Sequence, residues 1–316
     1  MDFVLILVGI ILLTVGGEAL IHGAMGSAKR LKISPVMSGI IIVGFGTSAP
    51  ELAVSIDAAL SGNSDLAIGN VVGSNIGNVL LILGLCAVIK PLTIQPKILH
   101  RDAMIAVLAS IIASAALLFN ILNITGGILL VGLLITYLVV VFNSEKDVSI
   151  PSAQLHISES KEITMFPSKD WLLIVSVLMG LMLLIGGSKV LLLGAVGLAK
   201  DFGVSEAAIG LTLVAVGTSL PELSISVIAV FRKHTDVAIG NVLGSNIFNI
   251  LGILGASAML QPLTPSSRML SFDLWVMLAA IIALVFILKI TKKLSRVTGG
   301  LLLICYSGYV YLSFNL

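Results

Sequence analysis

Charged residues are scarce in this sequence of 316 residues. Asp, Glu, Lys and Arg together make up 11% of the chain, whereas a soluble domain carries about 25%. This scarcity excludes an ordinary cytosolic enzyme and a disordered chain. The 18 basic and 16 acidic side chains leave a formal net charge of +2, which is too small for the basic surface that a nucleic-acid-binding protein needs.

Cysteine, histidine and catalytic motifs are also scarce. Cys86 and Cys305 have no spacing that is typical of a disulfide framework or a metal site. The four histidines form no cluster, and the sequence contains no HExxH, GxSxG or Walker motif. We therefore expect neither an enzyme nor a bound cofactor.

Apolar residues, in contrast, make up 58% of the chain, and the mean hydropathy is +1.15. A helix needs roughly 20 apolar residues to span a bilayer. The sequence predicts an all-α polytopic membrane protein with the lipid bilayer as its surroundings, and ten runs of sufficient length: 3–27, 36–60, 66–89, 102–120, 124–142, 170–199, 207–231, 237–260, 270–290 and 297–314.

The two halves of the chain are repeats of each other. A shift of 171 positions aligns residues 9–93 with residues 180–264 without a gap. GTSAPEL (46–52) then meets GTSLPEL (217–223), and AIGNVVGSNIGN (67–78) meets AIGNVLGSNIFN (238–249). We therefore expect a first repeat at 1–142, a polar linker at 143–169 and a second repeat at 170–316.

The distribution of basic residues predicts how the repeats lie in the membrane. Five spans per repeat is an odd number, so the second repeat should enter the membrane upside down. Of the 18 Lys and Arg residues, 15 fall in loops on one side and two on the other, and cytoplasmic loops carry the excess of positive charge. We expect an inner or plasma membrane protein with both termini outside and residues 143–169 in the cytoplasm. Inverted repeats are typical of secondary transporters.

Glu51 and Glu222 are repeat mates in the middle of predicted spans. Ionised groups at bilayer depth are costly and usually functional. The pseudo-twofold axis should bring the two carboxylates together, where they would repel each other unless a cation lies between them. Oxygen ligands without nearby Cys or His suit a hard ion, Ca²⁺ or Na⁺.

Glu18 and Asp57 also lie within predicted spans. Their repeat mates are Lys189 and Ile228, so neither position is acidic in both repeats. We interpret both as interfacial side chains rather than as cation ligands.

A proline precedes each of the paired glutamates. Pro50 and Pro221 have no N–H, and each ring clashes with the carbonyl group four residues earlier. This predicts two broken helices whose carbonyl groups line a cavity or bind an ion. The expected groups are the carbonyls from Gly44 to Thr47 and from Ala215 to Thr218, and the hydroxyls of Thr47, Ser48, Thr218 and Ser219.

The following span of each repeat supplies a facing wall. Asn70, Ser74 and Asn78 are four residues apart and share one helix face. Their repeat mates are Asn241, Ser245 and Asn249. We expect Ser74, Asn78, Ser245 and Asn249 to face the glutamates, whereas Asn70 and Asn241 are equally suited to joining helices.

These paired motifs strongly resemble the two α-repeats of the calcium/cation antiporter superfamily, and within it the prokaryotic sodium/calcium exchanger branch. The resemblance implies Na⁺/Ca²⁺ exchange by alternating access, in which the first and sixth spans slide past the core. It implies that Glu51, Glu222 and the carbonyls of Thr47 and Thr218 bind Ca²⁺. Flanking Na⁺ sites would use Ser48, Ser74, Asn78, Ser219, Ser245 and the carbonyls near Gly44 and Ala215.

One position departs from part of that superfamily. Potassium-dependent members, and some archaeal K⁺-independent ones, carry Asp where this chain has Asn249. Asn at this position resembles K⁺-independent members, so the resemblance implies exchange without K⁺. Two protons would neutralise the glutamate pair as well as two Na⁺ ions, so a Ca²⁺/H⁺ antiporter remains an alternative. A cation channel is a third possibility, but channels usually build their filters from identical subunits. We expect the chain to function as a monomer.

The predicted topology can be tested at Ser152, within the polar linker. A cysteine introduced by Ser152→Cys should react with a membrane-impermeant thiol reagent in inverted vesicles, because the linker is expected in the cytoplasm. Labelling of the same variant in right-side-out cells would contradict the inverted arrangement.

Overall fold

The computed structural model describes residues 2–31, 35–93, 99–146, 170–202 and 215–315. Most of the predicted linker and the first part of the predicted span 207–231 lie outside these residues.

The first half of the chain consists of helices interrupted at the expected break. Its elements are α1 (Asp2–Leu31), α2 (Pro35–Ser38), the π-helical turn η1 (Gly39–Gly44), α3 (Phe45–Thr47), α4 (Ala49–Leu60), α5 (Ser64–Gly77), η2 (Asn78–Ile82), α6 (Leu83–Ile89), β1 (Leu92–Thr93), η3 (Leu99–Ala103), α8 (Met104–Leu118) and α9 (Ile124–Lys146).

The second half has a similar order of helices, but its strand lies between the last two long helices rather than before them. Its elements are α11 (Asp170–Asp201), α13 (Ala215–Thr218), α14 (Leu220–Phe231), α15 (Thr235–Ile247), η6 (Phe248–Leu254), α16 (Gly255–Leu260), η7 (Met269–Asp273), α17 (Leu274–Thr291), β2 (Lys293–Leu294) and α18 (Arg296–Asn315). The two short strands pair antiparallel, with Leu92 opposite Leu294.

The described helices are those of a multi-pass membrane protein. Seven of them are long and apolar enough to cross a bilayer, or eight if Gly39–Thr47 and Ala49–Leu60, which meet at an angle of 47°, form one span. Helices occur in all ten predicted runs, but α18 and the 12-residue α14 are not among these candidates. Ten spans therefore remain a prediction. The outer surface exposes large apolar side chains such as Phe3, Leu178 and Ile290, which suits contact with lipid.

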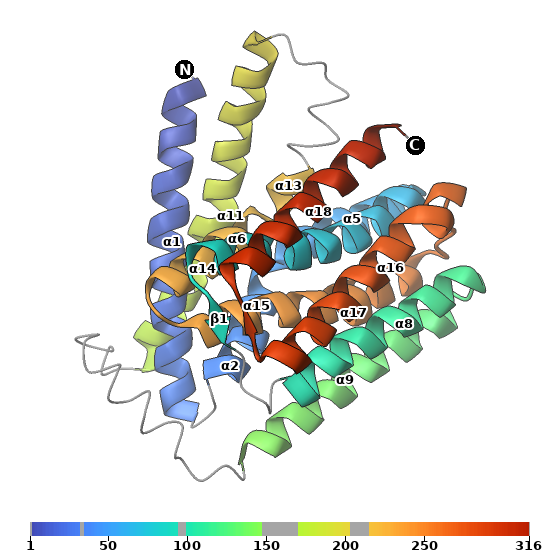
Figure 1. Ribbon diagram of the computed structural model, residues 1–316, viewed down its shortest axis with the longest axis horizontal. Coiled ribbons are helices and arrows are strands. Elements are labelled where there is room, and N and C mark those ends of the chain that lie inside the picture. The colour runs from blue at the N-terminus through green and yellow to red at the C-terminus, as the bar shows by residue number, and fades with distance from the viewer. Residues whose placement is uncertain (1, 32–34, 94–98, 147–169, 203–214, 316) are drawn as a thin grey trace.

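Helices α1 and α11 run side by side along one edge of the molecule (Figure 1). A glycine occurs every seven residues on each helix, at Gly9, Gly16 and Gly23 and at Gly180, Gly187 and Gly194. A Cβ atom at Gly16 would lie 2.9 Å from the backbone nitrogen of Leu184, and one at Gly180 would lie 2.6 Å from that of Leu20. Glycine therefore allows the two backbones to approach closely.

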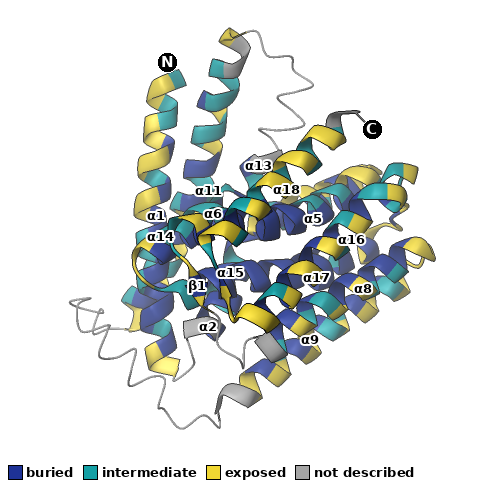
Figure 2. Cartoon of the chain, viewed as in Figure 1, coloured by how far each residue is buried: buried dark blue, intermediate teal, exposed yellow. Residues whose placement is uncertain are grey.

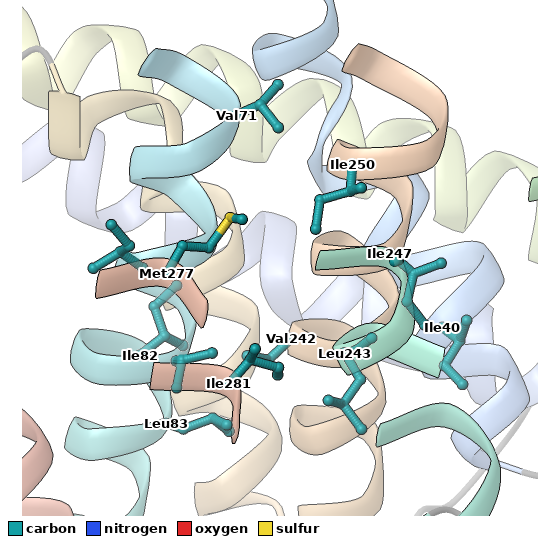
Figure 3. Close-up of a cluster of buried hydrophobic side chains, with 14 of the residues drawn as sticks. Ile40, Val71, Ile82, Leu83, Val242, Leu243, Ile247, Ile250, Met277 and Ile281 are labelled. Atoms are coloured by element: carbon teal, nitrogen blue, oxygen red, sulfur yellow. The ribbon is translucent and has the colours of Figure 1, made fainter. Parts of the chain in front are cut away.

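Helix α15 and the following turn η6 form the centre of the molecule, where they are buried along almost their whole length (Figure 2). Apolar side chains from several helices pack around this centre (Figure 3). They include Ile40 of η1, Val71 of α5, Ile82 of η2, Val242, Leu243 and Ile247 of α15, and Met277 and Ile281 of α17. This packing holds the broken helices in place from both halves of the chain.

The glycine contacts between α1 and α11 predict different effects at two adjacent positions. A Cβ atom at Gly187 would lie 2.9 Å from the backbone nitrogen of Leu13, whereas nothing lies within 4 Å of one at Gly186. Gly187→Ala should lower the thermal unfolding midpoint in detergent, because the helices must move apart. Gly186→Ala should leave the midpoint unchanged or raise it, because alanine favours helix by about 1 kcal/mol over glycine. Equal midpoints for the two variants would contradict the close packing.

Candidate cation-binding site

The two helix breaks place Glu51 and Glu222 at equivalent positions. Helix α3 ends at Thr47 and α13 ends at Thr218, and the next residue in each case has a ψ close to zero, 8° at Ser48 and 6° at Ser219. The proline of each motif then lies at the start of the next helix, so each glutamate falls in a first helical turn. The partial positive charge of a helix N-terminus favours a carboxylate there.

Each break contacts the glutamate of the other half. The hydroxyl of Ser48 donates a hydrogen bond to Oε1 of Glu222 (3.1 Å), and the hydroxyl of Ser219 donates one to Oε1 of Glu51 (3.3 Å). Both glutamate side chains are buried, with 1% of each exposed. The structure thus brings together the two residues that the repeat alignment pairs.

Among the described residues, five buried oxygens in this region have no hydrogen-bond partner: Oε2 of Glu51, Oε2 of Glu222, Oδ1 of Asn78, Oδ1 of Asn249 and the hydroxyl oxygen of Thr218. Buried polar atoms are normally bonded, because leaving one unpaired is costly. An amide oxygen and the oxygens of an ionised carboxylate cannot donate a hydrogen bond. They can only accept one or bind a cation. The donor set is therefore that of a hard cation such as Ca²⁺ or Na⁺.

Several predicted hydroxyl groups surround the carbonyl oxygen of Gly44. The hydroxyl of Ser245 donates to this oxygen at 3.0 Å. The hydroxyls of Thr47 (3.4 Å) and Ser48 (3.0 Å) also lie within hydrogen-bonding distance of it, and Ser48 shares its single hydroxyl proton between this carbonyl and Glu222. The Gly44 carbonyl also accepts a hydrogen bond from the backbone N–H of Ser48, so the predicted free carbonyl is bonded. The hydroxyl oxygens of Ser219 and Ser74 lie 3.4 Å apart, within hydrogen-bonding distance.

In each half, one asparagine joins the glutamate-bearing helix to the helix that follows it. The amide of Asn70 donates to the carbonyl of Glu51 (3.0 Å) and to the hydroxyl of Ser55 (2.8 Å). Asn241 makes the equivalent bonds to the carbonyl of Glu222 (3.2 Å) and to the hydroxyl of Ser226 (2.8 Å). These contacts favour a role of both asparagines in helix packing. The sequence interpretation missed Ser55 and Ser226, although they are repeat mates.

The acidic residues that lack acidic mates lie elsewhere. Glu18 forms an ion pair with Arg232, at 2.7 Å between the carboxylate and the guanidinium. Asp57 is exposed. Both positions agree with interfacial side chains.

The sequence interpretation also missed two buried acids, Asp102 and Asp273, which are repeat mates. The hydroxyl of Tyr137 donates to Asp102 at 3.1 Å, and that of Tyr309 donates to Asp273 at 3.0 Å. An arginine lies beside each acid: Arg101 at 2.8 Å from Asp102 and Arg268 at 3.4 Å from Asp273. The 171-residue shift could have identified the pair. The contacts with tyrosine and arginine indicate that both acids have a structural role.

Comparisons with known proteins agree with this geometry. Residues 1–143 and 172–315 match the family model described as sodium/calcium exchanger protein. The chain is 37% identical over 315 residues to a protein of Alkalimonas amylolytica that carries the name antiporter CaxA, covering 99% of this chain and 98% of that protein. It is 30% identical over 351 aligned residues to the sodium/calcium exchanger MaX1 of Methanosarcina acetivorans, covering 99% and 98% of the two chains.

A solved structure shows the same fold. The sodium-calcium exchanger NCX_Mj, soaked with Na⁺ and Sr²⁺, superposes on the chain with a TM-score of 0.82 and 28% sequence identity, covering 98% of this chain and 97% of that one. This similarity extends over the entire fold rather than over the motifs alone. The chain therefore belongs to the sodium/calcium exchanger protein family, whose members are membrane transporters rather than enzymes.

Proposed function

We propose that the protein is a secondary antiporter that exchanges Na⁺ for Ca²⁺ across the membrane by alternating access. The observation that carries this proposal is the pair of buried glutamates, Glu51 and Glu222, each with one carboxylate oxygen that lacks a partner. The names of MaX1 and NCX_Mj support the choice of ions.

We assign the central Ca²⁺ ligands to Glu51 and Glu222, together with the carbonyl oxygens of Thr47 and Thr218. The contacts of the neighbouring hydroxyls support flanking Na⁺ positions, because Ser48 and Ser219 each touch the glutamate of the opposite half. The proposed Na⁺ ligands are Ser48, Ser74, Asn78, Ser219, Ser245, Asn249 and the carbonyls of Gly44 and Ala215. The Gly44 carbonyl would have to exchange a hydroxyl hydrogen bond for the ion, since Ser48 and Ser245 contact it in the structure.

The charge of the glutamate pair explains why transport would be an exchange. Two ionised carboxylates give the site a charge of −2, which one Ca²⁺ or two Na⁺ ions neutralise. An empty site would have to carry both charges through a closed state, and each buried ion costs several kcal/mol even after relaxation. The carrier would therefore change its orientation only when loaded, and Ca²⁺ and Na⁺ would compete for the same oxygens.

Ten spans in two inverted repeats would place the site at the membrane midplane. The equivalent hydrogen bonds of Asn70 and Asn241, at positions 171 residues apart, support this symmetry. We propose an inner or plasma membrane location, termini outside and residues 143–169 in the cytoplasm. Because both halves of one chain supply the site, a monomer would suffice. The glycine-packed pair of α1 and α11 would slide past the core.

The two glutamates provide the main test of this proposal. Glu51→Gln and Glu222→Gln each remove one charge and preserve the side-chain shape. At 4 Å and an effective dielectric constant of 20, one charge pair is worth about 4 kcal/mol. Half of that would weaken Ca²⁺ binding more than about tenfold. Both variants should nearly abolish Na⁺-driven ⁴⁵Ca²⁺ uptake into proteoliposomes, by similar amounts.

Glu18→Gln is the matched control for these variants, because it removes the same charge from an exposed ion pair worth about 1 kcal/mol or less. It should retain most of the uptake. All three variants should remain folded. Gln preserves the side-chain shape, a single Gln relieves the repulsion between the two buried carboxylates, and the Glu18 ion pair is exposed and contributes little. Nearly normal Ca²⁺ exchange by either Glu51→Gln or Glu222→Gln would overturn the proposed site.

The amide side chain at Asn249 predicts how Ca²⁺ uptake responds to K⁺. With an amide instead of a third carboxylate at this position, Na⁺-driven Ca²⁺ uptake should be unchanged when K⁺ is replaced by choline. Asn249→Asp should alter the cation dependence, or the charge moved per cycle, more than it alters the unfolding midpoint. Loss of uptake by the unaltered protein in choline would show that our interpretation of Asn249 is wrong.

A further inference from the structure

Four buried asparagines meet where the two halves of the chain cross. Asn75 lies near the end of α5 and Asn78 begins η2, whereas Asn246 lies near the end of α15 and Asn249 is in η6. Their exposed fractions are between 1% and 3%. Asn75 and Asn246 are repeat mates, as are Asn78 and Asn249. The candidate ligands therefore each have a buried amide three residues before them.

Each candidate ligand is bonded to the asparagine of the other half. The Nδ2 group of Asn78 donates to Oδ1 of Asn246 at 2.9 Å, and the Nδ2 group of Asn249 donates to Oδ1 of Asn75 at 3.2 Å. Both bonds use the nitrogen of the ligand and leave its oxygen without a partner in the part of the chain that the structure describes.

The direction of these bonds matters because an asparagine amide has two unlike ends. Its oxygen can bind a cation, whereas its NH₂ group carries positive partial charges that repel one. The two ends differ little in shape, so packing alone does not select which end faces the site. A neighbouring acceptor does select it, because that acceptor takes the NH₂ group.

The orientation of one acceptor is itself fixed by the backbone. Asn75 donates through Nδ2 to the carbonyl oxygen of Asn246 at 3.3 Å, which turns its Oδ1 toward Asn249. Buried, connected polar networks of this kind specify one arrangement when their members are bonded.

We propose that Asn75 and Asn246 are positioning residues, which hold the amides of Asn249 and Asn78 with their oxygens toward the transported cation. This inference rests on the proposed function. It adds that each half of the chain orients a ligand of the other half. The flanking Na⁺ positions therefore form only when the two halves are correctly placed against each other.

A double-mutant cycle tests the pairing directly. Asn246→Leu removes the acceptor but keeps a similar side-chain volume. It should weaken Na⁺ binding about tenfold, because the oxygen of Asn78 is no longer held toward the ion and contacts with charged groups are strong. In an Asn78→Ala background the same change should have almost no further effect, because the ligand that it orients is absent. Apparent dissociation constants would be measured by titrating Na⁺, and separately Ca²⁺, against the thermal stability of purified protein in detergent.

The cross-pairings supply the matched controls. Asn246→Leu should remain additive with Asn249→Ala, and Asn75→Leu should couple to Asn249→Ala but not to Asn78→Ala. Ca²⁺ binding should weaken less than Na⁺ binding, because its proposed ligands are the glutamates and carbonyls. Asn246→Asp retains the acceptor and should bind Na⁺ at least as tightly as the unaltered protein.

Two outcomes separate failure of this inference from failure of the proposed function. Additive effects in all four cycles, or equal losses for Na⁺ and Ca²⁺, would show that the asparagines only stabilise the fold and would overturn the positioning role. An unaltered protein that binds neither ion would instead overturn the proposed function. If Asn246→Leu does not fold, Asn246→Ala in the same cycle gives the same comparison.

Discussion

The repulsion between two buried carboxylates determines what the centre of this protein must bind. Glu51 and Glu222 are almost completely inaccessible, and each retains an oxygen without a hydrogen-bond partner. Such a pair is stable only with a compensating positive charge. The hydroxyls of Ser48 and Ser219 bond one oxygen of each carboxylate, but they are neutral. In the proposed mechanism, a transported cation supplies the missing charge and can leave again, so the site is not permanently occupied.

The architecture around this pair serves to hold two helix breaks face to face. Proline ends the hydrogen-bonding pattern of each helix, and the buried centre formed by α15 and η6 packs against both halves. Glycines bring α1 and α11 into backbone contact along one edge, separate from this centre. In the proposed transport cycle, a rigid centre would hold the ligands while the glycine-packed pair moves.

The helical architecture and the glutamate pair could be predicted from the sequence because they depend on local signals. Apolar runs, prolines and a fixed 171-residue shift identify helices, breaks and mates without any knowledge of packing. The hydrogen bond from Ser245 to the Gly44 carbonyl could not be predicted, since the two residues are 201 positions apart, whereas the contacts of this carbonyl with Thr47 and Ser48 are local. The same holds for the amide network, because the sequence shows Asn75 beside Asn78 but not its contact with Asn249. Asp102 and Asp273 were recognisable as mates, yet their tyrosine partners depend on how helices pack.

In the proposed mechanism, a Na⁺ gradient drives the transport of Ca²⁺, which binds to the glutamate pair. The most direct measurement is ⁴⁵Ca²⁺ uptake by proteoliposomes of the unaltered protein under imposed gradients of Na⁺, K⁺ or pH, each applied separately. Exchange of Na⁺ for Ca²⁺ predicts uptake with an outward Na⁺ gradient, saturation at a low turnover, and no uptake with a K⁺ or pH gradient alone. Uptake driven by pH and indifferent to Na⁺ would contradict it and would identify protons as the ions exchanged for Ca²⁺.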